Sequence, residues 1–124
     1  ARLAPEWFEL HNNLGRALHA AEKFDDAAQA YRKCLALKVD HLPAMCNLAS
    51  VLMDSGHFTE AESICIDVLR QYPDFAEAQL MLGSVRGFQG RQLEALGNFA
   101  LAARLDPGNP RIDLLRPELR GYFT

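Results

Sequence analysis

The same pattern of residue types returns every 34 positions along this chain. A leucine followed by a small residue recurs at this interval, at Leu14-Gly15, Leu48-Ala49 and Leu82-Gly83. An alanine recurs in the same phase, at Ala27, Ala61 and Ala95. A period of this length, without insertion or deletion, indicates a repeat protein in which each copy buries its apolar face by stacking on a neighbour.

Each copy is predicted to form two helices joined by a tight turn. Apolar residues in the first copy recur at the three- and four-residue steps of an amphipathic helix, at Leu10, Leu14, Ala17, Leu18 and Ala21. A second apolar stripe runs from Phe24 to Leu37, after a break at Glu22-Lys23. The small residues at the repeated positions let the paired helices approach closely. The expected fold class is therefore all-α.

Helix starts are predicted at three places. Thr59 and Asp74 each begin a segment that fits the reciprocal capping pattern or its Asp variant. Asn109-Pro110 supplies an N-cap followed by proline at the first helical position. The third copy is expected to be the weakest, because Gly87 and Gly97 lie inside its helices at roughly 1 kcal/mol each relative to alanine.

These positions resemble the signature of the tetratricopeptide repeat family, which runs from a bulky residue through Leu-Gly, a large residue, Ala, an aromatic and a small residue to Pro. The large place holds Leu18, Leu52 and Arg86, the aromatic place holds Tyr31, Cys65 and Phe99, and the closing place holds Val39, Pro73 and Pro107. The departures include His11, Met45 and Gln79 at the usual Trp place, and Glu22 where the other copies have Gly56 and Gly90.

The resemblance covers residues 8 to 109 and implies an α-solenoid, a right-handed superhelix of three helix-turn-helix repeats. We expect repeats at residues 8–41, 42–75 and 76–109. Residues 1–7 are expected to be the tail of a preceding repeat or an N-terminal extension. Pro5 lies in phase with Pro107, which predicts at least one further repeat upstream in a longer protein. Residues 110–124 are expected to form a C-terminal capping helix or a linker into a following domain.

Composition excludes several other functions. A net charge of −3 gives no basic stripe for nucleic acid, and no apolar run approaches the roughly 20 residues that span a bilayer. Three cysteines at irregular spacing argue against a disulfide framework, and at least two of them are expected to be small packing residues on helices. Free cysteines favour a reducing compartment, so the expected location is the cytoplasm. The four histidines are not spaced as metal ligands. We expect no cofactor, no metal and no catalytic residues, so the chain is not expected to be an enzyme.

The resemblance also implies where a partner binds. In this family the first helix of each repeat lines a concave groove that holds an extended peptide or a partner helix. Carried onto this sequence, the predicted groove residues are Asn12, Asn13, Arg16, Cys46, Asn47, Ser50, Leu80, Met81, Ser84 and Phe88. His19 falls on the same lining.

Asn13 and Asn47 are one repeat apart, and a side-chain amide both donates to and accepts from a peptide backbone. This spacing resembles the asparagine ladder of the repeats attached to O-linked N-acetylglucosamine transferases, interrupted here at Met81. The third repeat is expected to prefer an apolar side chain, through Leu80 and Phe88.

Members of the family that bind heat-shock-protein tails hold a C-terminal carboxylate at five places. Those places are occupied here by Asn12, Arg16, Asn47, Glu77 and Met81. Only Asn47 fits, so tight binding of such tails is not expected.

The primary prediction is a protein-interaction module that binds a protein or peptide partner. Two alternatives stay open. One is a substrate-recruiting domain of a larger enzyme, such as a glycosyltransferase or a hydroxylase. The other is a self-assembling scaffold that associates end to end through Trp7, Phe8, Tyr122 and Phe123.

Overall fold

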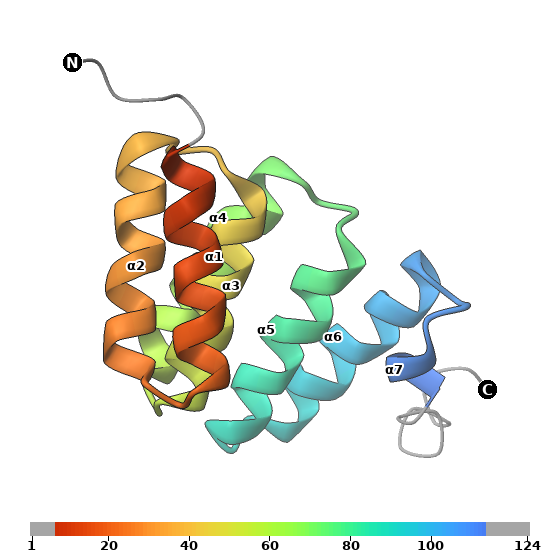
Figure 1. Cartoon of the computed structure of the whole chain (residues 1–124). Coiled ribbons are helices and arrows are strands. Elements are labelled where there is room, and N and C mark those ends of the chain that lie inside the picture. Colours follow the sequence, from red (N-terminus) through yellow and green to blue (C-terminus); the bar gives the residue numbers. More distant parts are fainter. Residues whose placement is uncertain (1–6, 114–124) are drawn as a thin grey trace. The chain divides into compact units, whose positions relative to one another are not determined.

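A computed structural model describes residues 7–113 of the chain, and every regular element in that range is an α-helix (Figure 1). The helices are α1 (Trp7–Ala20), α2 (Phe24–Leu37), α3 (Leu42–Asp54), α4 (Phe58–Gln71), α5 (Ala76–Phe88), α6 (Gln92–Leu105) and the short α7 (Pro110–Asp113). The predicted all-α helical repeat fold is therefore confirmed. The described chain forms two compact units that divide within α4, between Ile64 and Cys65. We call them the N-terminal unit and the C-terminal unit.

The N-terminal unit is built around the pairing of α1 with α2, which lie side by side (Figure 1). A glycine in α1 makes this pairing close. A Cβ atom added to Gly15 would lie 2.5–2.8 Å from three ring atoms of Tyr31, which is fully buried on α2. α3 packs against the other side of the pair, mainly against α2. The predicted close approach at Gly15 is confirmed in this unit, and Ala27 is fully buried.

The C-terminal unit repeats the same contact between α5 and α6. A Cβ atom on Gly83 would lie 2.6 Å from a ring atom of Phe99 and 3.1 Å from the Cβ of Asn98. Behind this contact, the α5 residue Leu80 joins a buried cluster with small residues of α6, which are Ala100, Ala102 and Ala103. In both units, a glycine on the first helix of the pair therefore leaves room for an aromatic ring on the second helix.

The turns between paired helices need a left-handed backbone. Gly56 and Gly90 adopt φ of +85° and +82°, and Glu22 adopts φ of +61° at the equivalent place. Glu22 thus keeps the glycine conformation although it carries a Cβ atom, at a cost of roughly 1–2 kcal/mol.

The predicted helix starts had mixed outcomes. The Asn109 cap is confirmed, because the Arg111 backbone N–H donates to Asn109 Oδ1 at 2.9 Å. The Asp74 cap is wrong, since the N-cap of α5 is Phe75, whose carbonyl accepts from the backbone N–H groups of Ala78 and Gln79 and whose side chain caps nothing.

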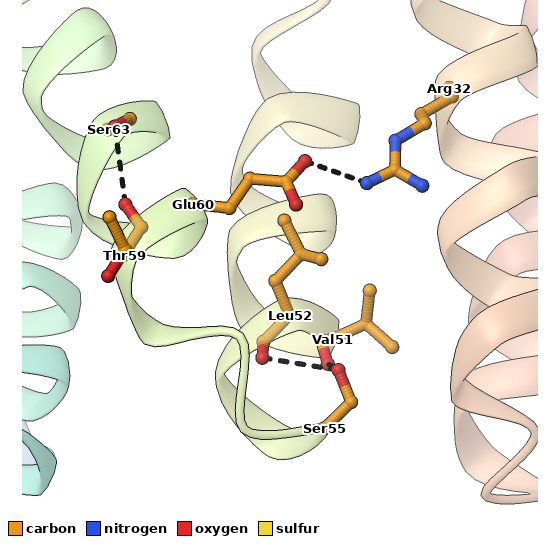
Figure 2. A network of polar contacts seen from close by, with 7 residues as sticks. All are labelled: Arg32, Val51, Leu52, Ser55, Thr59, Glu60 and Ser63. Carbon is orange, nitrogen blue, oxygen red and sulfur yellow. Dashed lines mark hydrogen bonds and ion pairs between the residues drawn. The ribbon is translucent and has the colours of Figure 1, made fainter.

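The Thr59 cap is also wrong, because α4 already begins at Phe58. The Thr59 carbonyl instead accepts a hydrogen bond from Ser63 Oγ at 3.2 Å (Figure 2). At the end of α3, Ser55 Oγ donates to the Val51 and Leu52 carbonyls at 2.9 and 3.2 Å (Figure 2). The side chains at this turn therefore bond to carbonyls rather than to free N–H groups.

An ion pair connects the second helices within the N-terminal unit. Arg32 on α2 donates to Glu60 near the start of α4 at 2.7 Å (Figure 2). Both side chains are about half exposed, so the pair adds little stability and mainly orients the start of α4.

Several sequence-based predictions lie outside the described residues. These are the tail of a preceding repeat with Pro5, the C-terminal capping helix beyond Asp113, and the contacts of Tyr122 and Phe123. Within the described range, α7 begins at the predicted Pro110.

We predict that Gly15→Ala and Gly83→Ala each lower the free energy of unfolding by roughly 1–3 kcal/mol, because the added methyl group displaces a packed aromatic ring. Urea unfolding followed by circular dichroism measures this change. The matched control is Gly97→Ala on α6, where an added Cβ meets nothing within 4 Å. This control should stabilise by roughly 1 kcal/mol, since alanine favours the helix over glycine. Equal effects at all three positions would contradict the close-packing argument.

Candidate peptide-binding face

The first helices of the first two repeats, α1 and α3, are connected by an amide pair in the N-terminal unit. Asn47 Nδ2 donates to Asn12 Oδ1 at 3.1 Å. Asn12 is only 8% exposed, so its carbonyl is occupied and shielded rather than displayed on a groove surface. Both residues were predicted to line the groove. In the structure Asn12 is buried and accepts a hydrogen bond from the Asn47 side chain.

An open hollow lies beside this pair, with a volume of about 480 Å³. We call it the α1–α3 hollow, and it is lined by Arg16, His19, Ala20, Glu22, Phe24, Tyr31, Asn47 and Asp54. It brings together two of the predicted groove residues, Arg16 and Asn47. Side chains from two first helices meet here over an aromatic base from α2.

The far end of the hollow is closed by a pair that sequence reasoning missed. His19 Nε2 donates to Asp54 Oδ2 at 2.6 Å, which joins the last turn of α1 to the end of α3. Asp54 stays about half exposed, so its second oxygen can accept from a ligand. The sequence carried a usable signal, because the two residues are separated by one repeat plus one position.

Arg16 supplies the positive charge of the hollow. Its guanidinium forms no hydrogen bond or ion pair with any residue between Trp7 and Asp113. Burial raises the pKa of Tyr31, and the nearby charge of Arg16 acts in the opposite direction. Arg16 is therefore exposed, close to the aromatic base and available to a ligand.

A second, larger hollow of about 830 Å³ shares Glu22, Phe24 and Asp54 with the first. Its other lining residues are Lys23, Asp25, Asp26, Ser55 and His57. Four carboxylates face one lysine here, so this end of the surface carries a negative potential.

The remaining predicted residues of the N-terminal unit differ in exposure. Asn13 is exposed and its side chain makes no hydrogen bond within the described range, whereas Asn47 is half-buried and paired. The two asparagines therefore do not repeat one environment. Cys46 and Ser50 are half-buried on α3.

In the C-terminal unit the predicted residues divide more sharply. Leu80 is 3% exposed and belongs to the core cluster, and Met81 is also buried. Ser84 Oγ already donates to the Leu80 carbonyl at 3.1 Å. Phe88, at 67% exposure, is the predicted apolar residue that remains accessible on this unit. The repeat register alone did not predict these differences, because a given helix position can face a neighbouring helix in one repeat and the solvent in another.

A buried polar network in the C-terminal unit was missed as a network. Asn98 Nδ2 donates to Gln79 Oε1 at 2.8 Å, and the Arg86 guanidinium donates to Asn98 Oδ1 at 2.8 Å. Gln79 was noted as a departure from the repeat signature and Arg86 was assigned to its large place, but Asn98 was not singled out. It occupies a place that holds Ala30 and Ile64 in the other repeats, so a polar residue there was the signal.

The cysteines behave as packing residues. Cys34 and Cys65 are fully buried, as predicted for at least two of them, and no disulfide is formed among the three, all of which lie in the described range. Burial raises the pKa of the Cys34 thiol, as is typical of a cysteine in apolar surroundings.

Two kinds of feature are absent from residues 7–113. No three side chains of His, Cys, Asp or Glu come together in a way that could hold a metal ion in this range. None of its helices has the length and apolar character needed to traverse a bilayer.

Sequence comparison gives a family match and two distant relatives. The family model described as tetratricopeptide repeat matches residues 18–85. The chain is 29% identical over 101 residues to Protein NPGR1 of Arabidopsis thaliana, covering 80% of this chain and 15% of that protein. It is 27% identical over 77 residues to Protein O-mannosyl-transferase Tmtc3 of Drosophila melanogaster, covering 62% of this chain and 8% of that protein. The chain thus matches a small part of either relative.

Structural comparison gives several similar folds. The Arabidopsis OM64 TPR domain has a TM-score of 0.85 at 24% identity, covering 96% of this chain and 98% of that one. The first TPR domain of Spaghetti (RPAP3), bound to the HSP90 peptide SRMEEVD, has a TM-score of 0.82 at 21% identity, covering 96% and 92%. YrrB, a TPR protein with an unusual peptide-binding site, has a TM-score of 0.81 at 22% identity, covering 90% and 57%. At these identities the likeness establishes the fold.

We predict that Asn98→Ile alone lowers the free energy of unfolding by roughly 1–3 kcal/mol, because it leaves the buried Gln79 oxygen without its donor. The matched control is the triple variant Gln79→Met, Arg86→Leu, Asn98→Ile, which installs the residue types of the second repeat. It should be at least as stable as the wild type, since apolar groups replace all three polar side chains together. Thermal unfolding by circular dichroism makes the comparison. A triple variant less stable than the single one would contradict this account.

Proposed function

This chain belongs to the tetratricopeptide repeat family, and on that premise we propose that it is a protein-interaction module that holds an extended or helical segment of another polypeptide. The observation that carries the proposal is the α1–α3 hollow, where Arg16 and Asn47 lie together on the first helices of two repeats. The peptide-bound structural relative supports it by analogy of fold.

The chemistry of the hollow suits a polypeptide with a mixed surface. The Asn47 amide donates one hydrogen bond to Asn12, which leaves its carbonyl oxygen to accept from a partner N–H group. The Arg16 guanidinium is able to donate to a partner carbonyl. At the other end, Asp54 and Glu22 favour a lysine or arginine side chain.

We further propose that each unit, taken by itself, offers its accessible predicted groove residues to a partner. Asn13, Cys46 and Ser50 are the accessible or half-buried members in the N-terminal unit, and Phe88 is the exposed apolar member in the C-terminal unit. In this proposal the buried members, Leu80 and Met81, fix the helices that present the contacts.

The substrate-recruiting alternative is favoured by one observation, the similarity to Protein O-mannosyl-transferase Tmtc3. In that case the same surface would hold the substrate of a catalytic domain located elsewhere in a larger protein. Determining the length and sequence of the natural polypeptide distinguishes the alternatives, because a catalytic domain requires a long additional segment.

We predict that the double variant Arg16→Ala, Asp54→Asn binds partner peptides roughly tenfold more weakly than the wild type, a loss of about 1.4 kcal/mol. The peptides are selected from a random displayed library against the wild-type chain, and affinities are measured by isothermal titration calorimetry. Selected sequences should be enriched in lysine and arginine, and their affinity should fall as salt is raised.

The matched control for this experiment is Gln29→Ala, Lys33→Ala, which changes two exposed residues of α2 that line neither of the two hollows described above. Its affinity should stay within about twofold of the wild type. Equal affinities for both double variants would place binding elsewhere and refute the proposed site.

We also predict that the peptide SRMEEVD does not bind with micromolar affinity. Asn12 is buried, Met81 is buried, and Glu77 is held by an ion pair with Arg111, which leaves Arg16 as the cation among the five anchoring places. The carboxylates of the second hollow also repel an acidic tail. Calorimetric titration tests this, and a saturable micromolar isotherm would contradict it.

A further inference from the structure

A third hollow in the N-terminal unit is lined by residues of α2, of the α3–α4 turn and of α4, and its volume is about 380 Å³. Ala28 and Leu52 form its floor, and both are buried. The ion pair between Arg32 and Glu60 lies along it, and Figure 2 shows these two side chains reaching towards each other near Leu52. The third hollow therefore combines an apolar floor with charged sides, as binding clefts do.

The three hollows of the N-terminal unit are joined in a row by shared residues. Three residues at the tips of the helix pairs line both the α1–α3 hollow and the second hollow, namely Glu22, Phe24 and Asp54. Three others line both the second and the third hollow, namely Asp25, Ser55 and His57. Among the described residues, none lines both the α1–α3 hollow and the third hollow, so the second connects the other two. We call this row the track.

The track passes from the first helices of the two repeats to their second helices. It begins beside Arg16 on α1 and Asn47 on α3, and it ends beside Arg32 on α2 and Glu60 on α4. Between these ends it crosses the α1–α2 turn and the α3–α4 turn. A helix is a straight rod about 10–12 Å across, whereas an extended chain can bend at any residue. A ligand that follows the track is therefore extended.

The start of α2 offers hydrogen bonds that suit an extended chain. Phe24, Asp25 and Asp26 form the first turn of α2 and line the second hollow, and the N-cap residue Lys23 makes no side-chain hydrogen bond to this turn. The backbone N–H groups of a first helical turn have no partner within their own helix. An extended ligand has free carbonyl oxygens to accept from them, whereas a helical ligand has used most of its own.

We propose that the bound segment is extended and follows the whole track, with basic side chains over the second hollow. Four carboxylates face one lysine in that hollow, whereas the opposite charges of Arg32 and Glu60 offset each other in the third. This inference rests on the proposed function, because the track begins at the α1–α3 hollow. It adds the form of the partner segment and the path that the segment takes around the helix tips.

Cross-linking to the wild-type chain locates the two ends of the segment. The probes are the peptides selected from the displayed library, each carrying a photoreactive benzophenone at its first or its last residue. Mass spectrometry then identifies the labelled residues of the chain. One end of each peptide should label the α1–α3 hollow near Arg16 and Asn47, and the other end should label the third hollow near Gln29 and Arg32.

Asp25→Arg tests the path by affinity, because Asp25 lines the second and third hollows but not the α1–α3 hollow. It should weaken the selected peptides roughly tenfold, since an arginine repels their basic side chains. The matched control is Asp40→Arg, which changes the net charge equally at an exposed position outside the three hollows and should stay within about twofold. Gln29 lines the third hollow, but its truncation to alanine removes no charge, so the earlier control variant keeps its expected result.

A proline scan of the selected peptides tests their bound form. Proline removes one N–H group, and inside a helix it also clashes with the preceding turn. An extended peptide should have central positions at which proline weakens binding by less than about threefold. A helical peptide would lose more than about a hundredfold at every central position.

Two results would overturn the proposed path. One is that both peptide ends label only α1 and α3, and the other is equal affinity for Asp25→Arg and Asp40→Arg, with folding verified by circular dichroism. A loss of more than a hundredfold at every central proline would overturn the extended form. In each case the proposed function stands if Arg16→Ala, Asp54→Asn still weakens binding, and it fails if that variant binds as the wild type does.

Discussion

The contact between a helix glycine and an aromatic ring sets the spacing of the α1–α2 and α5–α6 pairs. Gly15 receives Tyr31 and Gly83 receives Phe99, and in both cases a Cβ atom would overlap the ring. Because the glycine and the ring are 16 positions apart in both pairs, the contact also fixes how the second helix is aligned with the first. The turn and the buried alanines then follow from that alignment.

This contact explains why so much of the fold could be predicted from the sequence. The recurrence of small and aromatic residues at 34-residue intervals encodes pairwise helix packing, which is nearly independent of what lies beyond the repeat. Even a substitution such as Glu22 did not change the turn, since neighbouring helices determine the backbone there. The sequence therefore sufficed to predict the helix pairs, the small-residue contacts and the buried cysteines.

The candidate site was less predictable, because a register position does not specify its surroundings. Asn12 and Leu80 hold the same place in different repeats, and one is buried in an amide pair while the other is buried in an apolar core. Asn98 connects Gln79 and Arg86, two residues that look unrelated in sequence. Such outcomes depend on which side chains are in contact between helices, and these contacts cannot be read from a single sequence.

Glu22 shows that folding and recognition compete at one turn. Its left-handed backbone costs roughly 1–2 kcal/mol, which a glycine would relieve. Its carboxylate, however, lines two hollows of the N-terminal unit. On the proposed function, a chain selected only for robustness would carry glycine here, and one selected for a basic partner would retain the acid. The residue at this turn therefore indicates whether selection for stability or selection for a basic partner has been the stronger.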